Sequence, residues 1–360
     1  MPRTRHFGEL PDGRAVTAYD LGSAGVRLTV LDLGATVQQL AVPDFAGGGV
    51  GVVLGYDDVE GYLSPGNAYL GAVVGRYANR IAGARFTLDG VIHHLTKNEG
   101  DTCLHGGVDG FHRRLWTLVD HSDAALTMEL VSPDGDQGFP GALTARARYE
   151  VTRAAVSLEL TATCDRATVV SLTNHAYFNL GGVGRGTIDD HVLTVDADDY
   201  LPVDERSIPL GHHQSVAGTP FDFRAGARVG ERMRQPHQQL SLTQGIDHAY
   251  RLRGKGMRRA ARLTHPPSGR VLEVNTDQPS LQVYTGNFLD ATTDGHEGRA
   301  LRQGDGIALE TQRHPDAPNQ AALGESILRP VEGYSSTIQW RFSMDAAAGG
   351  VRSARPLSRG

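Results

Sequence analysis

The sequence of 360 residues contains only two cysteines, Cys103 and Cys164. Two cysteines provide no disulfide framework, and the spacing between them is not that of a metal-binding cysteine pair. No run of about 18 apolar residues is present, so no segment could cross a bilayer as a helix. The opening residues, MPRTRHFGELPDGR, lack the apolar centre of a secretory signal peptide. These absences predict a cytoplasmic protein without a membrane partner.

An excess of basic charge is also missing. Lys and Arg number 35 against 41 Asp and Glu, for a net charge of −6. Nucleic-acid binding needs clustered Lys and Arg facing the phosphates, so no nucleic-acid partner is expected. One basic run does occur, RLRGKGMRRAAR at 251–262, and we interpret it as a solvated hairpin tip.

Several catalytic signatures do not occur. The chain has no G-x-S-x-G elbow, no P-loop, no G-x-G-x-x-G before a helix, and its HEG at 296–298 is not H-E-x-x-H. We therefore expect no cofactor and no metal. The chemistry that is left is proton transfer on a neutral, hydroxyl-rich molecule.

Runs in which apolar and polar residues alternate, as in strands, occur along the whole chain and are separated by turn signals. The clearest runs are 26–42, 125–133, 155–164, 191–204, 269–288 and 336–344. Helical patterns are scarce; 227–240 could form a short helix that Pro236 stops. This pattern predicts a large antiparallel all-β sandwich. No domain boundary is evident, so we expect one domain over 1–345 and a flexible tail over 346–360.

The stretch SLTNHAYFNLGG at 171–182 reads as a strand with two different faces. One face is mostly apolar and resembles core, while the other carries His175 and Tyr177. Neighbouring polar rings without partners are costly in a core. A cleft floor explains both side chains.

Two loops carry further polar groups. In GRYANRIAGARF, Arg76 and Arg80 flank Asn79. They form either a solvated surface turn or a cluster of donors for an oxygen-rich ligand. His105 precedes the Gly106-Gly107 pair, where the backbone could approach a ligand closely.

Two carboxylates lie on strand-like runs. Asp247 in GIDHAYRL is either an Asx-type turn residue or part of a site. Glu310 in GIALETQ is either exposed at a sheet edge or aimed into a cleft. Together, His175 and Glu310 have the chemistry of a general acid–base pair near neutral pH.

Several motifs of the chain, in the order in which they occur, resemble motifs of the aldose 1-epimerases. They are GRYANRIAGARF, LHGG, LTNHAYFNL, YLPVDERSIP, PFDFR, GIDHAY, YTGNFLD and LETQRHPDAPNQ. The resemblance runs from residue 7 to about residue 342. It implies a galactose mutarotase-like β-supersandwich and the interconversion of α- and β-anomers of free hexoses such as galactose and glucose. It implies no cofactor, and it leaves monomer and homodimer open.

The resemblance also implies roles for single residues. Glu310 corresponds to the general base and His175 to the general acid. His105 would hydrogen-bond the sugar near its ring oxygen, and Asp247 would hold a hydroxyl with both oxygens. The remaining expected sugar-binding residues are Asn79, Arg80, Tyr177 and Gln282.

Three alternatives stay open at this stage. A glycoside hydrolase would need two carboxylates, for which Glu310 and Asp247 could be proposed. A non-catalytic carbohydrate-binding module would bind a hexose without changing it. A hexose-6-phosphate epimerase would need a basic phosphate clamp. The aromatic platform beneath the sugar is also undecided among Trp116, Tyr177 and Phe288.

Overall fold

The computed structural model describes residues 3–22, 25–44, 48–64 and 68–345. The expected tail at 346–360 lies outside the described residues. Every strand pair named in this part of the chain is antiparallel, and helices are few and short, as the alternation predicted. The α-helices of the described residues are α1 (Val59–Leu63), α2 (Val229–Met233) and α3 (Gln238–Thr243).

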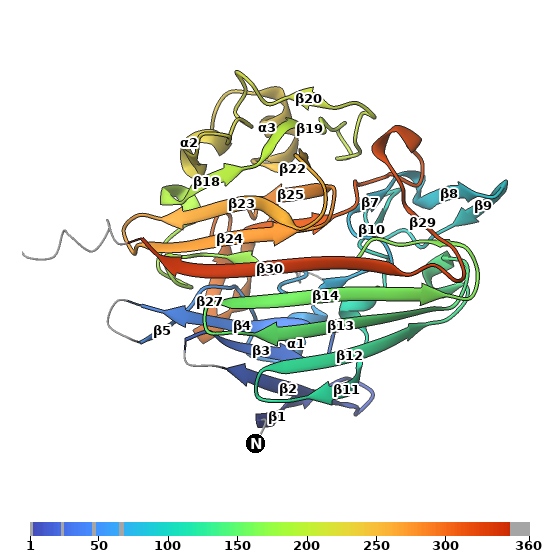
Figure 1. Ribbon diagram of the computed structural model, residues 1–360, viewed down its shortest axis with the longest axis horizontal. Coiled ribbons are helices and arrows are strands. Elements are labelled where there is room, and N and C mark those ends of the chain that lie inside the picture. The colour runs from blue at the N-terminus through green and yellow to red at the C-terminus, as the bar shows by residue number, and fades with distance from the viewer. Residues whose placement is uncertain (1–2, 23–24, 45–47, 65–67, 346–360) are drawn as a thin grey trace, which may run out of the picture.

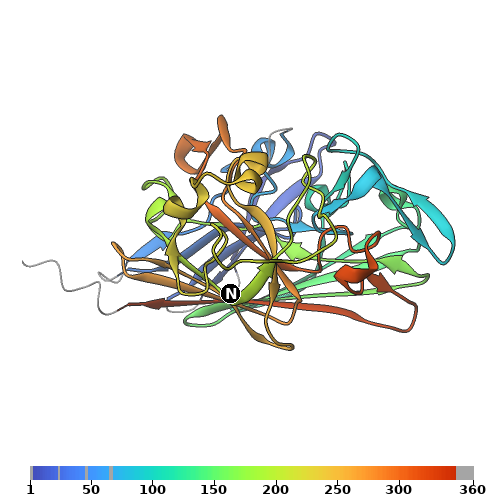
Figure 2. The same cartoon turned by 90° about the horizontal axis from the view of Figure 1, so that it is seen from above.

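A nine-stranded sheet forms one broad layer (Figure 1). Its strands in spatial order are β11 (Thr117–His121), β12 (Ala125–Ser132), β13 (Leu143–Val151), β14 (Ala155–Cys164), β30 (Tyr334–Met344), β24 (Arg270–Thr276), β23 (Arg258–His265), β18 (Val192–Val195) and β21 (Ala227–Arg228). Figure 2 shows this sheet edge-on as a curved layer, with most of the other strands and loops on one side of it.

Two further sheets lie against the large one. The first contains β1 (Arg3–Glu9), β2 (Ala15–Gly22), β3 (Arg27–Leu31), β4 (Thr36–Pro43) and β5 (Gly49–Gly51). The second contains, in spatial order, β17 (Tyr177–Phe178), β28 (Ile307–Gln312), β25 (Ser280–Tyr284), β22 (Asp247–Leu252), β19 (Ala197–Tyr200) and β20 (Gln214–Ser215).

Five two-stranded ladders complete the described strands. They are β6 (Val73–Val74) with β16 (Thr173–Asn174), β7 (Arg80–Ile81) with β10 (Cys103–Leu104), β8 (Arg85–Leu88) with β9 (Val91–His94), β15 (Thr168–Val169) with β29 (Ile327–Leu328), and β26 (Asp290–Gly295) with β27 (Arg299–Arg302).

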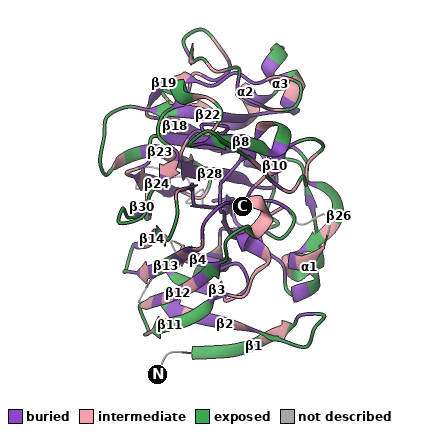
Figure 3. Ribbon diagram, turned by 90° about the vertical axis from the view of Figure 1, so that its right-hand side faces the viewer, coloured by how far each residue is buried: buried purple, intermediate pink, exposed green. Residues whose placement is uncertain are grey.

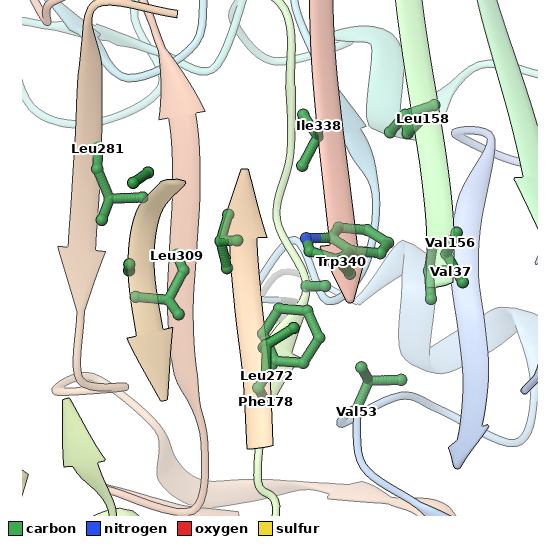
Figure 4. Packing of buried hydrophobic residues seen from close by; sticks show 14 of the residues in the cluster. Val37, Val53, Val156, Leu158, Phe178, Leu272, Leu281, Leu309, Ile338 and Trp340 are labelled. Atoms are coloured by element: carbon green, nitrogen blue, oxygen red, sulfur yellow. The ribbon is translucent and has the colours of Figure 1, made fainter. Parts of the chain in front are cut away.

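The main core lies between the large sheet and the other two (Figure 4). Trp340 of β30 meets Phe178 of β17 edge to face, with ring centroids 5.5 Å apart. Strand β13 alternates buried and less buried residues, because only one of its faces contacts the core. Strand β28 is buried on both faces, and it appears as an interior strand in Figure 3. Its second face is therefore free to carry a buried site.

Two local predictions were wrong. The stretch at 171–182 is not one strand, because His175 leaves the ladder and exchanges backbone hydrogen bonds with Gly71 and Ala72. The basic run at 251–262 is solvated but is not a hairpin, since β22 and β23 belong to different sheets. Three of its arginines, Arg251, Arg253 and Arg259, pair with aspartates of the 196–199 segment. The short helical segment near Pro236 is present as α2 and α3.

Candidate active site

A pocket with a volume of about 220 Å³ opens on the face of the six-stranded sheet that points away from the main core. This is smaller than the roughly 300–1,000 Å³ of pockets for drug-sized ligands. Its wall is formed by Ala68, Tyr69, Asn79, Arg80, Glu99, Leu104, His105, His175, Tyr177, Asp247, Tyr284, Phe288 and Glu310. Seven of the eight site residues expected from the sequence are in this wall, and the eighth, Gln282, lies behind it.

His175 and Glu310 meet beside the short β17–β28 ladder. Tyr177 pairs with Ala308 in this antiparallel ladder. His175, two residues before Tyr177, has left the ladder but still lies next to Glu310, two residues after Ala308. The His175 Nε2 atom lies 3.6 Å from Glu310 Oε1, and both side chains are buried. His175 Nδ1 and Glu310 Oε2 have no protein hydrogen-bond partner. Two proton-exchanging groups are thus left unsatisfied beside one cavity.

Burial controls the charge of this pair. It raises the pKa of Glu310 well above the usual value, and the nearby Asp247 carboxylate adds to this rise while Arg80 opposes it. Burial lowers the pKa of His175 to about 4. In the pocket without sugar, both shifts favour neutral side chains, with the shared proton on Glu310.

His105 is held as a hydrogen-bond donor. The backbone N–H of Asn79 donates to His105 Nδ1 at 3.1 Å, and burial lowers the pKa of His105 well below its usual value. The neutral ring therefore carries its proton on Nε2. Nitrogen and oxygen atoms of His105, His175 and Glu310 lie within 4.8 Å of one another, as in some metal sites. In this tautomer, however, His105 Nε2 carries the ring proton, so it is a hydrogen-bond donor and not an ion ligand.

Gly106, the first glycine after His105, is needed for a close contact with protein backbone and not for a contact with the pocket. A side chain on Gly106, which has φ +89°, would place its Cβ 1.9 Å from the carbonyl oxygen of Gly75. The expected close approach is therefore between two loops rather than between loop and ligand. It fixes the His105 segment against the Gly75 loop.

Asn79 and Arg80 are presented by the tight turn that enters β7. Asn79 has φ +66°, a left-handed conformation that asparagine tolerates well. Its Oδ1 accepts a hydrogen bond from the Arg80 backbone N–H at 2.8 Å. Nδ2 of Asn79 is thus left as a donor for the pocket.

Asp247 is oriented by two partners. Gln282 Nε2 donates to Asp247 Oδ1 at 2.6 Å, and Arg80 Nη1 lies 3.5 Å from Asp247 Oδ2. Alternation on β25 and β22 places Gln282 and Asp247 on the same face of the sheet. Gln282 is therefore in contact with the wall residue Asp247, and its expected contact with the sugar stays a prediction.

The aromatic part of the wall contains Tyr69, Tyr177, Tyr284 and Phe288. The Tyr177 ring stacks on His175 with centroids 5.0 Å apart, and its hydroxyl donates to the Ala68 carbonyl oxygen. Phe288 is 53% exposed at the pocket mouth. Trp116 is outside this wall, because it is buried against Phe111. Tyr177 and Phe288 are thus the two expected platform candidates that the pocket contains.

Three polar wall residues, Tyr69, Glu99 and Tyr284, were not identified from the sequence. Tyr284 shares a strand face with Gln282, so the period of two could have revealed it. Tyr69 and Glu99 lie in loops without periodicity, and no sequence signal marked them. Conversely, Arg76 is not at the site, because it is a buried structural cation that donates to Ser132 Oγ and to backbone carbonyls.

The chain is similar in sequence to known proteins along nearly its whole length. The family model described as aldose 1-epimerase matches residues 17–341. The chain belongs to the aldose 1-epimerase family. Curated relatives include galactose mutarotase of Bos taurus, 44% identical over 94% of this chain and 97% of the relative. Aldose 1-epimerase of Escherichia coli K12 is 40% identical over 92% of this chain and 96% of the relative.

Solved structures of the aldose 1-epimerase family have the same fold. Galactose 1-epimerase from Lactobacillus acidophilus superposes with a TM-score of 0.84 at 31% identity, covering 96% of this chain and 99% of the other. The GalM/aldose epimerase homologue from C. elegans also gives 0.84 at 31% identity, covering 91% and 99%. The predicted family and β-supersandwich fold are confirmed.

Proposed function

We propose that this protein is a mutarotase that interconverts the α- and β-anomers of free aldohexoses such as galactose and glucose. The observation that carries the proposal is the buried His175–Glu310 pair, whose Nε2 and Oε1 atoms lie 3.6 Å apart beside a pocket of monosaccharide size. A cyclic sugar inserted there meets one proton-exchanging group at its anomeric hydroxyl and another at its ring oxygen. The membership of this chain in the aldose 1-epimerase family supports the same chemistry.

The proposed reaction moves two protons and breaks one bond. Glu310, as the carboxylate, takes the proton from the anomeric O1 hydroxyl, and C1–O1 becomes a carbonyl. The electrons of the C1–O5 bond leave with O5, which takes a proton from the imidazolium of His175. Rotation about C1–C2 then presents the other carbonyl face, and the reversed steps close the ring as the opposite anomer.

The electrostatics of the pair fit this cycle. Ring opening converts anionic Glu310 and cationic His175 into two neutral side chains, and burial favours that neutral state. The charged state must form when the cyclic sugar binds. A hydrogen bond from the O1 hydroxyl to Glu310 stabilises its anion for this step. The pair holds one proton throughout, so no exchange with solvent is required.

The pocket favours uncharged sugars. It contains one guanidinium, Arg80, against the carboxyl groups of Glu99, Asp247 and Glu310. Arg80 is already paired with two of these carboxylates. A sugar phosphate would meet no unpaired cation in this wall, so a free aldohexose is the better substrate and a hexose 6-phosphate a poor one.

The wider setting of the reaction also follows from the proposal. We expect residues 1–345 to act as one unit on a small sugar in the cytoplasm, as monomer or homodimer and without cofactor or nucleic acid. The pairing of Arg253 with Asp198 and of Arg259 with Asp196 supports the absence of a nucleic-acid surface. No helix in the ranges that the structure describes is long and apolar enough to span a bilayer.

Polarimetry of freshly dissolved α-D-galactose and α-D-glucose tests the function. The protein should accelerate the approach to the equilibrium rotation, and Glu310→Gln and His175→Asn should each lower kcat by about 10²–10⁴. Sugar binding should persist in both variants. No acceleration by the unaltered protein would overturn the proposal, and release of the leaving group from a chromogenic galactoside would indicate a hydrolase instead.

A matched control comes from the same strand. Thr311 follows Glu310 on β28, is buried, and points to the opposite face. Because valine has nearly the same shape as threonine, Thr311→Val should leave the rate of mutarotation unchanged. A large loss of activity in Thr311→Val would attribute the effect of Glu310→Gln to packing rather than to proton transfer.

A further inference from the structure

Glu99 makes the closest contacts to Arg80, the one guanidinium among the described residues of the pocket wall. Arg80 Nε donates to Glu99 Oε2 at 2.6 Å, and Arg80 Nη2 donates to Glu99 Oε1 at 2.8 Å. This is a two-pronged pair, the strongest geometry for arginine and a carboxylate. The Arg80 side chain is 9% exposed, whereas that of Glu99 is 39% exposed and lies on the pocket wall.

The second carboxylate beside Arg80 makes a looser contact. Asp247 Oδ2 lies 3.5 Å from Arg80 Nη1, too far for a strong hydrogen bond. Glu99 therefore takes one edge of the guanidinium and directs the Nη1 group toward Asp247 and the cavity. Asp247 keeps acceptor capacity for a sugar hydroxyl, because Arg80 does not close on it with both nitrogens.

The segment that carries Glu99 is itself held in place. The Thr102 hydroxyl donates to the Glu99 backbone carbonyl at 2.8 Å, and the Thr102 backbone N–H donates to the same oxygen at 2.9 Å. Asn98 exchanges two hydrogen bonds with the Leu104 backbone. The loop that positions Glu99 thus leads directly into His105, and its carboxylate has a defined place.

We propose that Glu99 is a positioning residue for the sugar: it holds Arg80 so that Nη1 and Asp247 can bind hydroxyls together. This inference rests on the proposed mutarotase function. Without Glu99, the opposite charges of Arg80 and Asp247 would draw the two side chains together. Arg80 Nη1 and the Asp247 carboxylate would then bind each other instead of sugar hydroxyls. The His175–Glu310 pair would stay as it is, so binding should suffer while the chemical step is preserved.

The test is a set of KM and kcat measurements by polarimetry. Glu99→Ala should raise KM for galactose about tenfold, with kcat changed less than threefold. Glu99→Gln keeps the reach and one acceptor oxygen, so its KM should lie between those of Glu99→Ala and the unaltered protein. Asp101→Asn is the matched control, because Asp101 lies on the same loop and pairs with Lys97 instead. Its KM should not change.

A double substitution separates positioning from a direct or purely structural effect. Since Glu99 acts through Arg80, Glu99→Ala should have no further effect on KM when Arg80→Ala is already present. An equal rise in KM on both backgrounds would overturn the inference, as would an unchanged KM in Glu99→Ala. A fall in kcat without a change in KM would also overturn it. Inactivity of the unaltered protein would refute the proposed function itself, so the two failures are distinguishable.

Discussion

His175 Nε2 lies 3.6 Å from Glu310 Oε1, although 134 residues separate them in the chain. The short β17–β28 ladder brings their segments together, because it pairs Tyr177, two residues after His175, with Ala308, two residues before Glu310. Both groups are buried, which shifts their pKa values in opposite directions. This arrangement determines how the reaction rate should depend on pH.

The acid limb of the pH profile should lie unusually low. The active pair holds one proton, and a second proton binds His175 only near its lowered pKa of about 4. We therefore expect kcat/KM to stay nearly constant from neutral pH down to about pH 5 and to fall near pH 4. The limb would be near pH 6.5 for an unshifted histidine. Initial-rate polarimetry, corrected for spontaneous mutarotation, measures it, and a limb at pH 6–7 would contradict the pKa shift.

Asp247→Asn should affect both binding and the alkaline limb. The amide loses the charge that strengthens a hydroxyl contact, which is worth about 1.5–3 kcal/mol for charged groups, or roughly ten- to hundredfold in KM. Asp247 also raises the pKa of Glu310 by charge repulsion. Its removal should move the alkaline limb to lower pH. An unchanged KM together with an unchanged limb would show that Asp247 has neither role.

Arg76→Met should lower stability and leave catalysis intact. The Arg76 side chain is 1% exposed and donates to Ser132 Oγ at 2.6 Å and to the carbonyl oxygens of Pro140 and Gly141 at 2.8 Å. Leaving these buried acceptors without their donor costs about 1–3 kcal/mol for each group. Urea unfolding should show this loss, while KM and kcat of the folded fraction stay unchanged. A raised KM with normal stability would instead indicate that Arg76 contributes to sugar binding.

The control for this substitution is an exposed arginine on β13, the strand that pairs with the Ser132-bearing strand β12. Arg146 pairs with Glu129 on the surface, with 57% of its side chain exposed. Exposed pairs contribute about 0–1 kcal/mol, so Arg146→Met should change stability little. A similar loss in both variants would show that the effect comes from the methionine and not from the buried network.

Acidification should destabilise the fold before most carboxylates titrate. Burial lowers the pKa of His112, His191 and His248 to about 3, whereas an unfolded histidine has a pKa of about 6.5. The unfolded state thus binds more protons below pH 6.5, so the stabilisation is complete above that value and is lost as pH falls. Each histidine contributes a slope of up to about 1.4 kcal/mol per pH unit.

Urea unfolding at pH 7, 6 and 5 measures this slope. His191→Gln should reduce the slope by about one proton, because glutamine can accept the Leu180 N–H that His191 Nε2 accepts at 2.8 Å and does not titrate. Stability that is constant or rises between pH 6.5 and 5 would contradict the neutral, buried state of these histidines.

Much of the site could be predicted from strand periodicity and motif chemistry. The sequence left Glu310 open between an exposed sheet edge and a cleft, and the structure places it in the pocket wall, as it does the histidine before two glycines. Glu99 could not be found this way, because loop residues have no fixed side-chain period. Arg76 and Arg80 lie four residues apart in one turn, yet one supports the fold and the other faces the pocket. Only their surroundings separate them.

The antiparallel β architecture, the kinds of acid and base available, and the family can all be predicted from the amino-acid sequence. Local alternation and residue chemistry are properties of neighbouring residues, so they can be read from the chain. The tertiary structure decided which distant groups share one cavity and which charges they carry there. Burial and the approach of Asp247 and Arg80 shift the proton affinities of His175 and Glu310, and both depend on packing between segments far apart in the chain.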